Sequence, residues 1–165
     1  MSADGVSIRI VTADDWEVLR GVRLAAMLDS PTAFGSTYER ELSFDSSAWR
    51  ARIERSPWWL AWREGQPVGM IAAFDSAPDT EPDDRHVVSM WVHPAHRGHG
   101  VADLLVETLA DWAVADGART LSLWVVIGND RARRFYERCG FVATGEIAPV
   151  RSNPSLSESL MRRPL

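Results

Sequence analysis

A turn from a strand into a helix, at His93–Ala102, constrains the fold of this chain more than any other segment. The apolar run Val87–Val92 before it is typical of a strand, and Val101–Trp112 after it repeats apolar residues at helical spacing. Gly98 and Gly100 allow the backbone to approach an anion closely, and the helix N-terminus adds roughly half a positive charge there. The segment therefore predicts a cradle for a diphosphate.

Two common phosphate loops do not fit this turn. A Walker loop requires a lysine directly after its last glycine, and no lysine follows Gly98 or Gly100. A dinucleotide fingerprint requires a third glycine, where this chain has Asp103, and it follows the first strand of its unit. Taken alone, the glycines fit either a phosphate loop of another kind or a tight turn that needs steric relief.

Composition narrows the class of protein further. The 165 residues suit a single domain, 1–165, and the formal charge of −5 argues against a nucleic-acid partner. Cys139 is the one cysteine, so neither an internal disulfide nor a multi-thiolate metal site can form. No stretch reaches the roughly 20 apolar residues of a membrane span, so we expect a cytoplasmic protein without a membrane partner.

The pattern along the chain predicts a mixed α/β domain around one sheet. Expected strands lie at 7–11, 58–63, 68–74, 87–92, 120–126, 141–145 and 156–163. Expected helices begin after a capping box of Thr12 and Asp15, near 45–47, at Val101 and at Asn129. Residues 31–41 read as irregular, and residues 76–85 read as an exposed acidic loop.

Two motifs resemble the GNAT superfamily of N-acetyltransferases. Arg97-x-x-Gly100-x-Ala102 is similar to the loop with which that family binds the pyrophosphate of acetyl-CoA. The segment Asn129–Phe141 resembles the family pattern Asn-x-x-Ala-x-x-x-Tyr-x-x-x-Gly-Phe. The resemblance covers about residues 86 to 142 and implies an α+β, GNAT-like fold: a mixed, largely antiparallel central sheet of about seven strands flanked by about four helices.

The resemblance also implies a reaction. Acetyl-CoA is the expected co-substrate, and its acetyl group passes to a primary amine of a small molecule or a peptide N-terminus by direct attack in a ternary complex. The implied coenzyme-binding positions lie on a splayed strand, in the turn and before the next helix: Met90, Trp91, Val92, Arg97, Gly98, His99, Gly100, Val101, Ala102 and Asn129. The alternatives are transfer to a protein lysine, transfer of another acyl group, and a non-catalytic acyl-CoA-binding regulatory module.

Tyr136 and His86 are the candidate catalytic residues. Tyr136 matches the family's general acid, which protonates the leaving thiolate, although it also fits a core aromatic beside Phe135. Relatives that acetylate ribosomal-protein N-termini carry a glutamate base where this chain has Trp124. At strand period two, His86 shares a face with Val88, Met90 and Val92, so it is either the base or a surface histidine.

Glu39 and Glu41 are candidate ligands for a cationic acceptor. They follow the first helix, in a segment that often covers the acceptor site in GNAT folds, and the alternative is that both are solvated loop charges. The histidines of the turn do not have the spacing of a metal site, so no metal is expected. Homodimers are common in the superfamily, and one is possible here.

Overall fold

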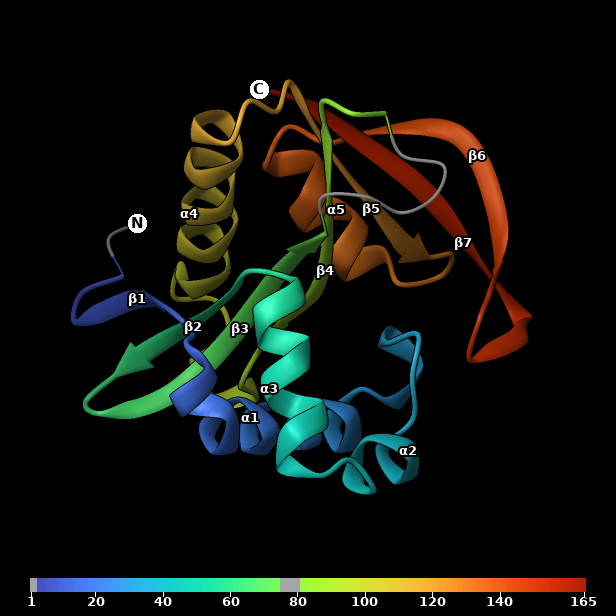
Figure 1. Cartoon of the computed structure of the whole chain (residues 1–165). Helices are drawn as coiled ribbons and strands as arrows, with labels where there is room; N and C mark the ends of the chain where they lie inside the picture. The colour runs from blue at the N-terminus through green and yellow to red at the C-terminus, as the bar shows by residue number, and fades with distance from the viewer. Residues whose placement is uncertain (1–2, 75–80) are drawn as a thin grey trace.

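A seven-stranded sheet crosses the computed structural model, which describes residues 3–74 and 81–165 (Figure 1). The strands are β1 (Val6–Ile10), β2 (Trp58–Arg63), β3 (Gln66–Phe74), β4 (Asp84–Val92), β5 (Thr120–Val126), β6 (Val142–Val150) and β7 (Asn153–Pro164). Their order is β1-β2-β3-β4-β5-β7-β6. Neighbouring strands are antiparallel except β4 and β5, which are parallel. The predicted mixed, largely antiparallel sheet is confirmed.

Helices cover both faces of this sheet. The α-helices are α1 (Trp16–Asp29), α2 (Tyr38–Leu42), α3 (Ser46–Arg55), α4 (Val101–Ala115) and α5 (Asp130–Arg138). The 3-10 turns are η1 (Ala13–Asp15), η2 (Pro31–Ala33) and η3 (Pro94–His96). None of these helices has the length and apolar character needed to cross a membrane.

The prediction of an irregular segment at 31–41 was wrong at α2. The Thr37 hydroxyl caps this short helix by accepting a hydrogen bond from the Arg40 backbone N–H, at 3.3 Å. The prediction failed because five residues give too little periodicity to detect, and the contacts that bury Glu41 come from residues distant in sequence. The expected capping box of Thr12 and Asp15 is present.

The start of β4 corrects a second prediction. Asp84 and Arg85 were expected in an exposed loop, yet both are buried strand residues. Asp84 accepts hydrogen bonds from Thr120 and Ser122 of β5, and Arg85 donates to Asp116 at the end of α4. These partners lie more than 30 residues away in sequence, so local polarity alone suggested a loop. Residues 81–83 are exposed, as expected, and residues 76–80 of the expected loop lie outside the described residues.

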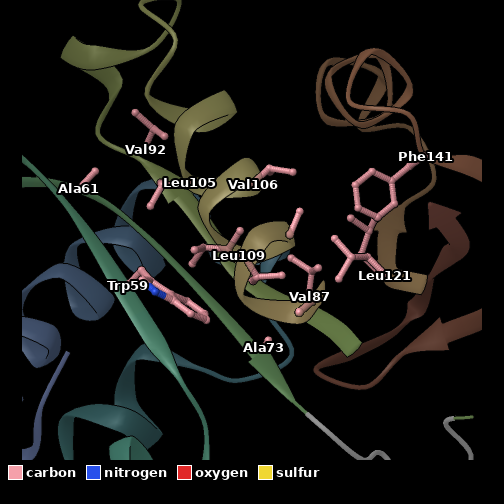
Figure 2. Close-up of a cluster of buried hydrophobic side chains, with 14 of the residues drawn as sticks. Trp59, Ala61, Ala73, Val87, Val92, Leu105, Val106, Leu109, Leu121 and Phe141 are labelled. Atoms are coloured by element: carbon pink, nitrogen blue, oxygen red, sulfur yellow. The ribbon is translucent and has the colours of Figure 1, made fainter. Parts of the chain in front are cut away.

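Two hydrophobic clusters hold the layers together, one on each face. On the face covered by α4, Leu105 and Leu109 pack against Trp59 and Val87 of the sheet (Figure 2). The aromatic and aliphatic side chains of α5 extend this cluster. On the opposite face, α1 and α3 pack over β2 and β3, with Trp49 fully buried among them.

A β-bulge in β4 decides which side chains share a face. Trp91 pairs with Met70 of β3 and Val88 pairs with Ala72, so Ser89 and Met90 together lie opposite one β3 residue. Ser89 adopts a φ of 58°, in the left-handed region. The extra residue reverses the alternation, so that Val88 and Trp91 pack on the α1 side.

His86 shares a face with Val88, as predicted, but the bulge makes the prediction wrong for Met90 and Val92. Met90 and Val92 pack with the α4 cluster, whereas His86 keeps the alternation of Val88 on the α1 side. The strands β4 and β5 also diverge, because among the described residues their pairing ends at His86 and Ser122. The expected splaying of this strand from its neighbour is therefore observed.

Candidate active site

A groove of about 1000 Å³ opens where β4 leaves β5. Its walls come from the end of β4, the turn after it, the first turn of α4 and the exposed side of α5. All of the predicted coenzyme-binding residues except His99 line the groove, and Tyr136 lines it with them. Segments far apart in sequence thus meet at one cavity, as the two motifs predicted.

The turn before α4 offers backbone donors to this groove. Gly98 and Gly100 both adopt a φ of 79°, a conformation that a side chain would strain. In the part of the chain that the structure describes, the N–H groups of Gly98, His99 and Gly100 donate no hydrogen bond. The first N–H groups of α4 lack intrahelical partners as well. The arrangement suits an anion with several oxygens.

The Arg97 side chain lines the groove and connects the turn to the end of β4 and to α1. Its Nε donates to the Val92 carbonyl at 2.8 Å, and its Nη2 forms an ion pair with Asp29 at the end of α1. The Trp91 indole N–H donates to the same Asp29 carboxylate at 3.0 Å. These bonds, with one from Ser30, lower the Asp29 pKa to about 2. Sequence reasoning missed Asp29, which lies 68 residues before Arg97.

Arginines on α5 add positive charge along one wall. Arg131, Arg134 and Arg138 line the groove, and all three are exposed. Arg138 pairs with Asp103 in the first turn of α4 at 3.2 Å. Arg131 and Arg134 have no ion pair within the described residues and remain available to an anion. Three arginines within 131–134 were the sequence signal for this wall, and sequence reasoning overlooked it.

Asn129 directly precedes α5, and Tyr136 lies near the end of that helix. The Asn129 side-chain oxygen caps the helix by accepting a hydrogen bond from the Ala132 N–H at 3.3 Å. No described residue accepts a hydrogen bond from the amide N–H₂ group of Asn129. The Tyr136 ring packs against Phe135 and Phe141. Burial raises the pKa of Tyr136 well above 10, which keeps its hydroxyl protonated at neutral pH. No described residue accepts or donates a hydrogen bond at that hydroxyl.

His86 lies outside the groove, at the point where β4 and β5 part. Its Nδ1 is 2.9 Å from the Ser122 hydroxyl, which in turn donates to the Asp84 carboxylate. Because that hydroxyl gives its hydrogen to Asp84, it accepts from Nδ1, and the His86 Nε2 is left as the acceptor nitrogen. Burial lowers the His86 pKa below 6.5, against the opposing effect of Asp84. This half-buried imidazole is therefore neutral at pH 7.

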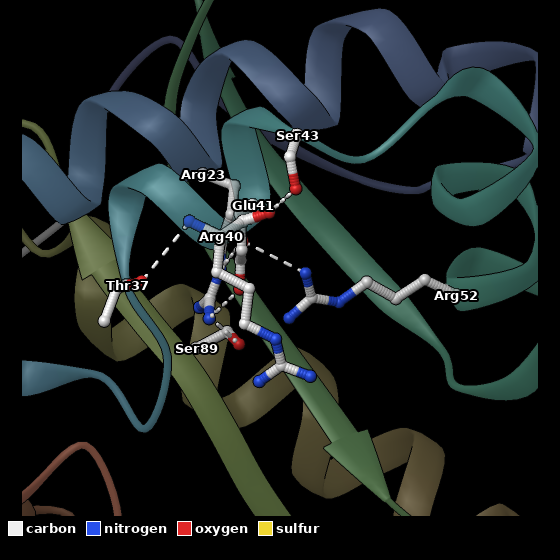
Figure 3. A network of polar contacts seen from close by, with 7 residues as sticks. All are labelled: Arg23, Thr37, Arg40, Glu41, Ser43, Arg52 and Ser89. Atoms are coloured by element: carbon white, nitrogen blue, oxygen red, sulfur yellow. Dashed lines mark hydrogen bonds and ion pairs between the residues drawn. The ribbon is translucent and has the colours of Figure 1, made fainter.

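Glu41 is not a free ligand for an acceptor. Its carboxylate is 1% exposed and accepts two hydrogen bonds from Arg23, at 2.8 and 3.0 Å, with Arg52 at 3.1 Å (Figure 3). Burial raises its pKa, but the bonds and charges of these arginines outweigh burial and hold the pKa below 4.5. The expectation that Glu41 binds the acceptor is wrong, because Glu41 and its partner Arg23 are both buried and bind each other. Glu39 is exposed on α2 and does not line the groove.

Comparison with known proteins identifies a family. The model of the acetyltransferase (GNAT) family matches residues 24–141 of this chain. An uncharacterized N-acetyltransferase of Methanocaldococcus jannaschii is 29% identical over 56% of this chain, which spans 42% of that relative. The L-amino acid N-acyltransferase MnaT of Escherichia coli is 26% identical, over 78% of this chain and 83% of the relative. The chain thus spans less than half of the first relative and most of the second.

Solved structures share the fold. A ribosomal-protein-alanine N-acetyltransferase from Brucella melitensis superposes with a TM-score of 0.80 at 20% identity, covering 96% of this chain and 99% of its own. A Salmonella typhimurium protein, described as an acetyltransferase and solved with acetyl-CoA, has a TM-score of 0.79 at 21% identity, with 97% and 94% covered.

Proposed function

This chain belongs to the acetyltransferase (GNAT) family, and from that premise we propose that it transfers the acetyl group of acetyl-CoA to a primary amine. The observation that carries the proposal is the groove in which Met90, Gly100 and Tyr136 meet. A donor cradle, a strand end with a diverging neighbour and a protonated phenol are the parts that acyl transfer from a thioester requires.

The groove fits the coenzyme by its donors. The backbone N–H groups from Gly98 to Ala102 would hold the diphosphate, and Arg131 and Arg134 would neutralise further phosphate charge. Met90, Trp91 and Val92 would pair with the pantetheine arm through their backbone, since β5 does not cover that part of β4. Acetyl-CoA supplies a thioester, whose carbonyl carbon is open to attack by an amine.

The protein's own groups account for the proton transfers and the developing charge. The Met90 backbone N–H would donate to the carbonyl oxygen as the amine nitrogen forms its bond to the carbon. The C–S bond then breaks, and Tyr136 would give its proton to the leaving sulfur. The amine loses one proton, which the His86 Nε2 would accept directly or through water.

The descriptions of two relatives support a proposal for the acceptor class. The Escherichia coli relative is described as an L-amino acid N-acyltransferase, and a Salmonella typhimurium relative, 27% identical over 78% of this chain, is described as an L-methionine sulfoximine/L-methionine sulfone acetyltransferase. These names favour a small amine of amino-acid type over a peptide N-terminus.

We propose further that residues 1–165 form one cytoplasmic domain that needs no nucleic acid, and that a homodimer is the assembly to test by light scattering.

Release of the coenzyme thiol tests the proposal. Purified chain is mixed with acetyl-CoA and with L-amino acids, aryl amines or short peptides, and free thiol is measured over time. We expect at least one amine class to stimulate release, and Tyr136→Phe to lower kcat about 10-fold or more while the coenzyme Kd stays within about threefold. Coenzyme binding without stimulated release by any amine would leave only the non-catalytic binding module.

A further inference from the structure

Ser89 holds an unusual backbone conformation at the place where β4 leaves β5. Among the described non-glycine residues, a positive φ is found at Ser89 and at Glu64. Glu64 belongs to the two-residue turn between β2 and β3, where such a φ is ordinary, whereas Ser89 lies inside a strand. A left-handed residue in a strand persists when its surroundings hold it there.

Within residues 3–74 and 81–165, the Ser89 side chain has one hydrogen-bond partner, Arg23. Arg23 of α1 donates from Nη1 to the Ser89 hydroxyl at 2.9 Å (Figure 3). The rest of this guanidinium is fixed by the two bonds to Glu41 and by the Phe34 ring, which lies 4.7 Å from its central carbon. Arg23 is 4% exposed, so its geometry is set by packing as well as by charge.

A buried ion pair of this kind needs a reason beyond stability. Removing two charges from water costs about as much as their attraction returns, and apolar residues of similar volume would hold α1 against α2 equally well. An apolar residue at 23 could not donate to Ser89. The Nη1 group of Arg23, which does not bond to Glu41, donates to Ser89 instead. This bond is what an arginine at position 23 adds to the fold.

We propose that Arg23 is a positioning residue for acetyl transfer. Through Ser89 it holds the bulge of β4 in the conformation that directs the next backbone N–H, that of Met90, toward the reacting carbonyl. The inference rests on the proposed function, since it concerns the same reaction. Arg23 does not line the groove and acts on the reaction through the backbone of β4.

Two substitutions at one position separate this role from simple packing. Ser89→Ala removes the hydroxyl and leaves a side chain that resists a φ of 58°, so the bulge relaxes. Ser89→Gly removes the same hydroxyl but adopts that φ freely. We expect kcat to fall about 10-fold to 100-fold in Ser89→Ala, as for other donors misplaced by about 1 Å, and to stay within about threefold of the parent in Ser89→Gly.

Arg23→Lys extends the test to the other partner. Lysine keeps a positive charge for Glu41 but lacks the forked donors, so it cannot serve Glu41 and Ser89 together. We expect Arg23→Lys to lose kcat as Ser89→Ala does. In the Ser89→Gly background the same change should cost less than about threefold, because glycine no longer needs the bond.

The measurements are kcat, the KM of each substrate, the Kd of coenzyme A by calorimetry and the thermal unfolding midpoint. Equal losses in Ser89→Ala and Ser89→Gly, or unchanged kcat in Ser89→Ala, would overturn the positioning role. Rescue of kcat by Ser89→Gly, with the unfolding midpoints of the two Ser89 variants close together, would support it. If the parent protein binds coenzyme A and acetylates no amine, the proposed function fails instead, so the two failures are distinct.

Discussion

The replacement Glu41→Gln tests whether this carboxylate is an internal charge or an acceptor ligand. The two residues have the same shape, so the change removes the charge that Arg23 and Arg52 share and leaves both cations with a neutral partner. Loss of one member of a buried pair costs about 3 kcal/mol or more. For a chain of this size that lowers the unfolding midpoint by about 6–12 °C. Thermal unfolding followed by circular dichroism at pH 7 measures it.

Glu39→Gln is the matched control, since Glu39 lies two residues away on the same short helix and is exposed. Its effect should stay within about 0.5 kcal/mol. The Glu41 pKa is held below 4.5 in the folded chain, so its contribution is complete above pH 4.5 and disappears as the pH falls through that lowered value. The gap between parent and Glu41→Gln should therefore be constant from pH 8 to pH 5 and narrow below 4.5. If Glu41→Gln unfolds at the same temperature as Glu39→Gln, the conclusion that Glu41 belongs to a stabilising internal ion pair is wrong.

Three further changes probe the groove and its supports. Gly100→Glu should weaken coenzyme A binding about 100-fold, measured by calorimetry, because the carboxylate repels the diphosphate. Gly100→Ala is the control for backbone strain. Unchanged affinity in Gly100→Glu would contradict the assignment of this turn to the diphosphate. His86→Ala should remove the limb of kcat/KM that rises with pH below 6.5, the side to which burial moves the His86 pKa, and a limb that persists would exclude His86 as the base. Gly69→Ala should destabilise the chain by about 1–3 kcal/mol in denaturant unfolding. Its Cβ would lie 2.9 Å from the Trp91 carbonyl oxygen and 3.2 Å from the Leu105 side chain. An unchanged midpoint would mean that β4 moves aside without loss of stability.

The groove proposed to hold the coenzyme could be predicted from sequence because its determinants are local. A strand, two glycines with positive φ and a helix start are encoded within His93–Ala102, and Asn129 caps the helix that carries Tyr136. Each of these features depends on residues a few positions apart. The same reasoning failed at His86, because one extra residue at the bulge reverses every face beyond it, and no residue type in β4 marks that bulge.

The arrangement around the segment after α1, where we propose that the acceptor binds, could not be predicted because its contacts join distant segments. Arg23 and Glu41, 18 residues apart, carry charges that look free in sequence and cancel in the fold. The Ser152 hydroxyl, at the turn between β6 and β7, donates to the Phe34 carbonyl at 2.8 Å across 118 residues. Phe34 lines the groove and also stacks on Arg23. The segment after α1 therefore lines the groove and is held by the last hairpin, and neither segment carries a recognisable motif. We expect changes in either segment to alter amine preference while leaving coenzyme affinity intact.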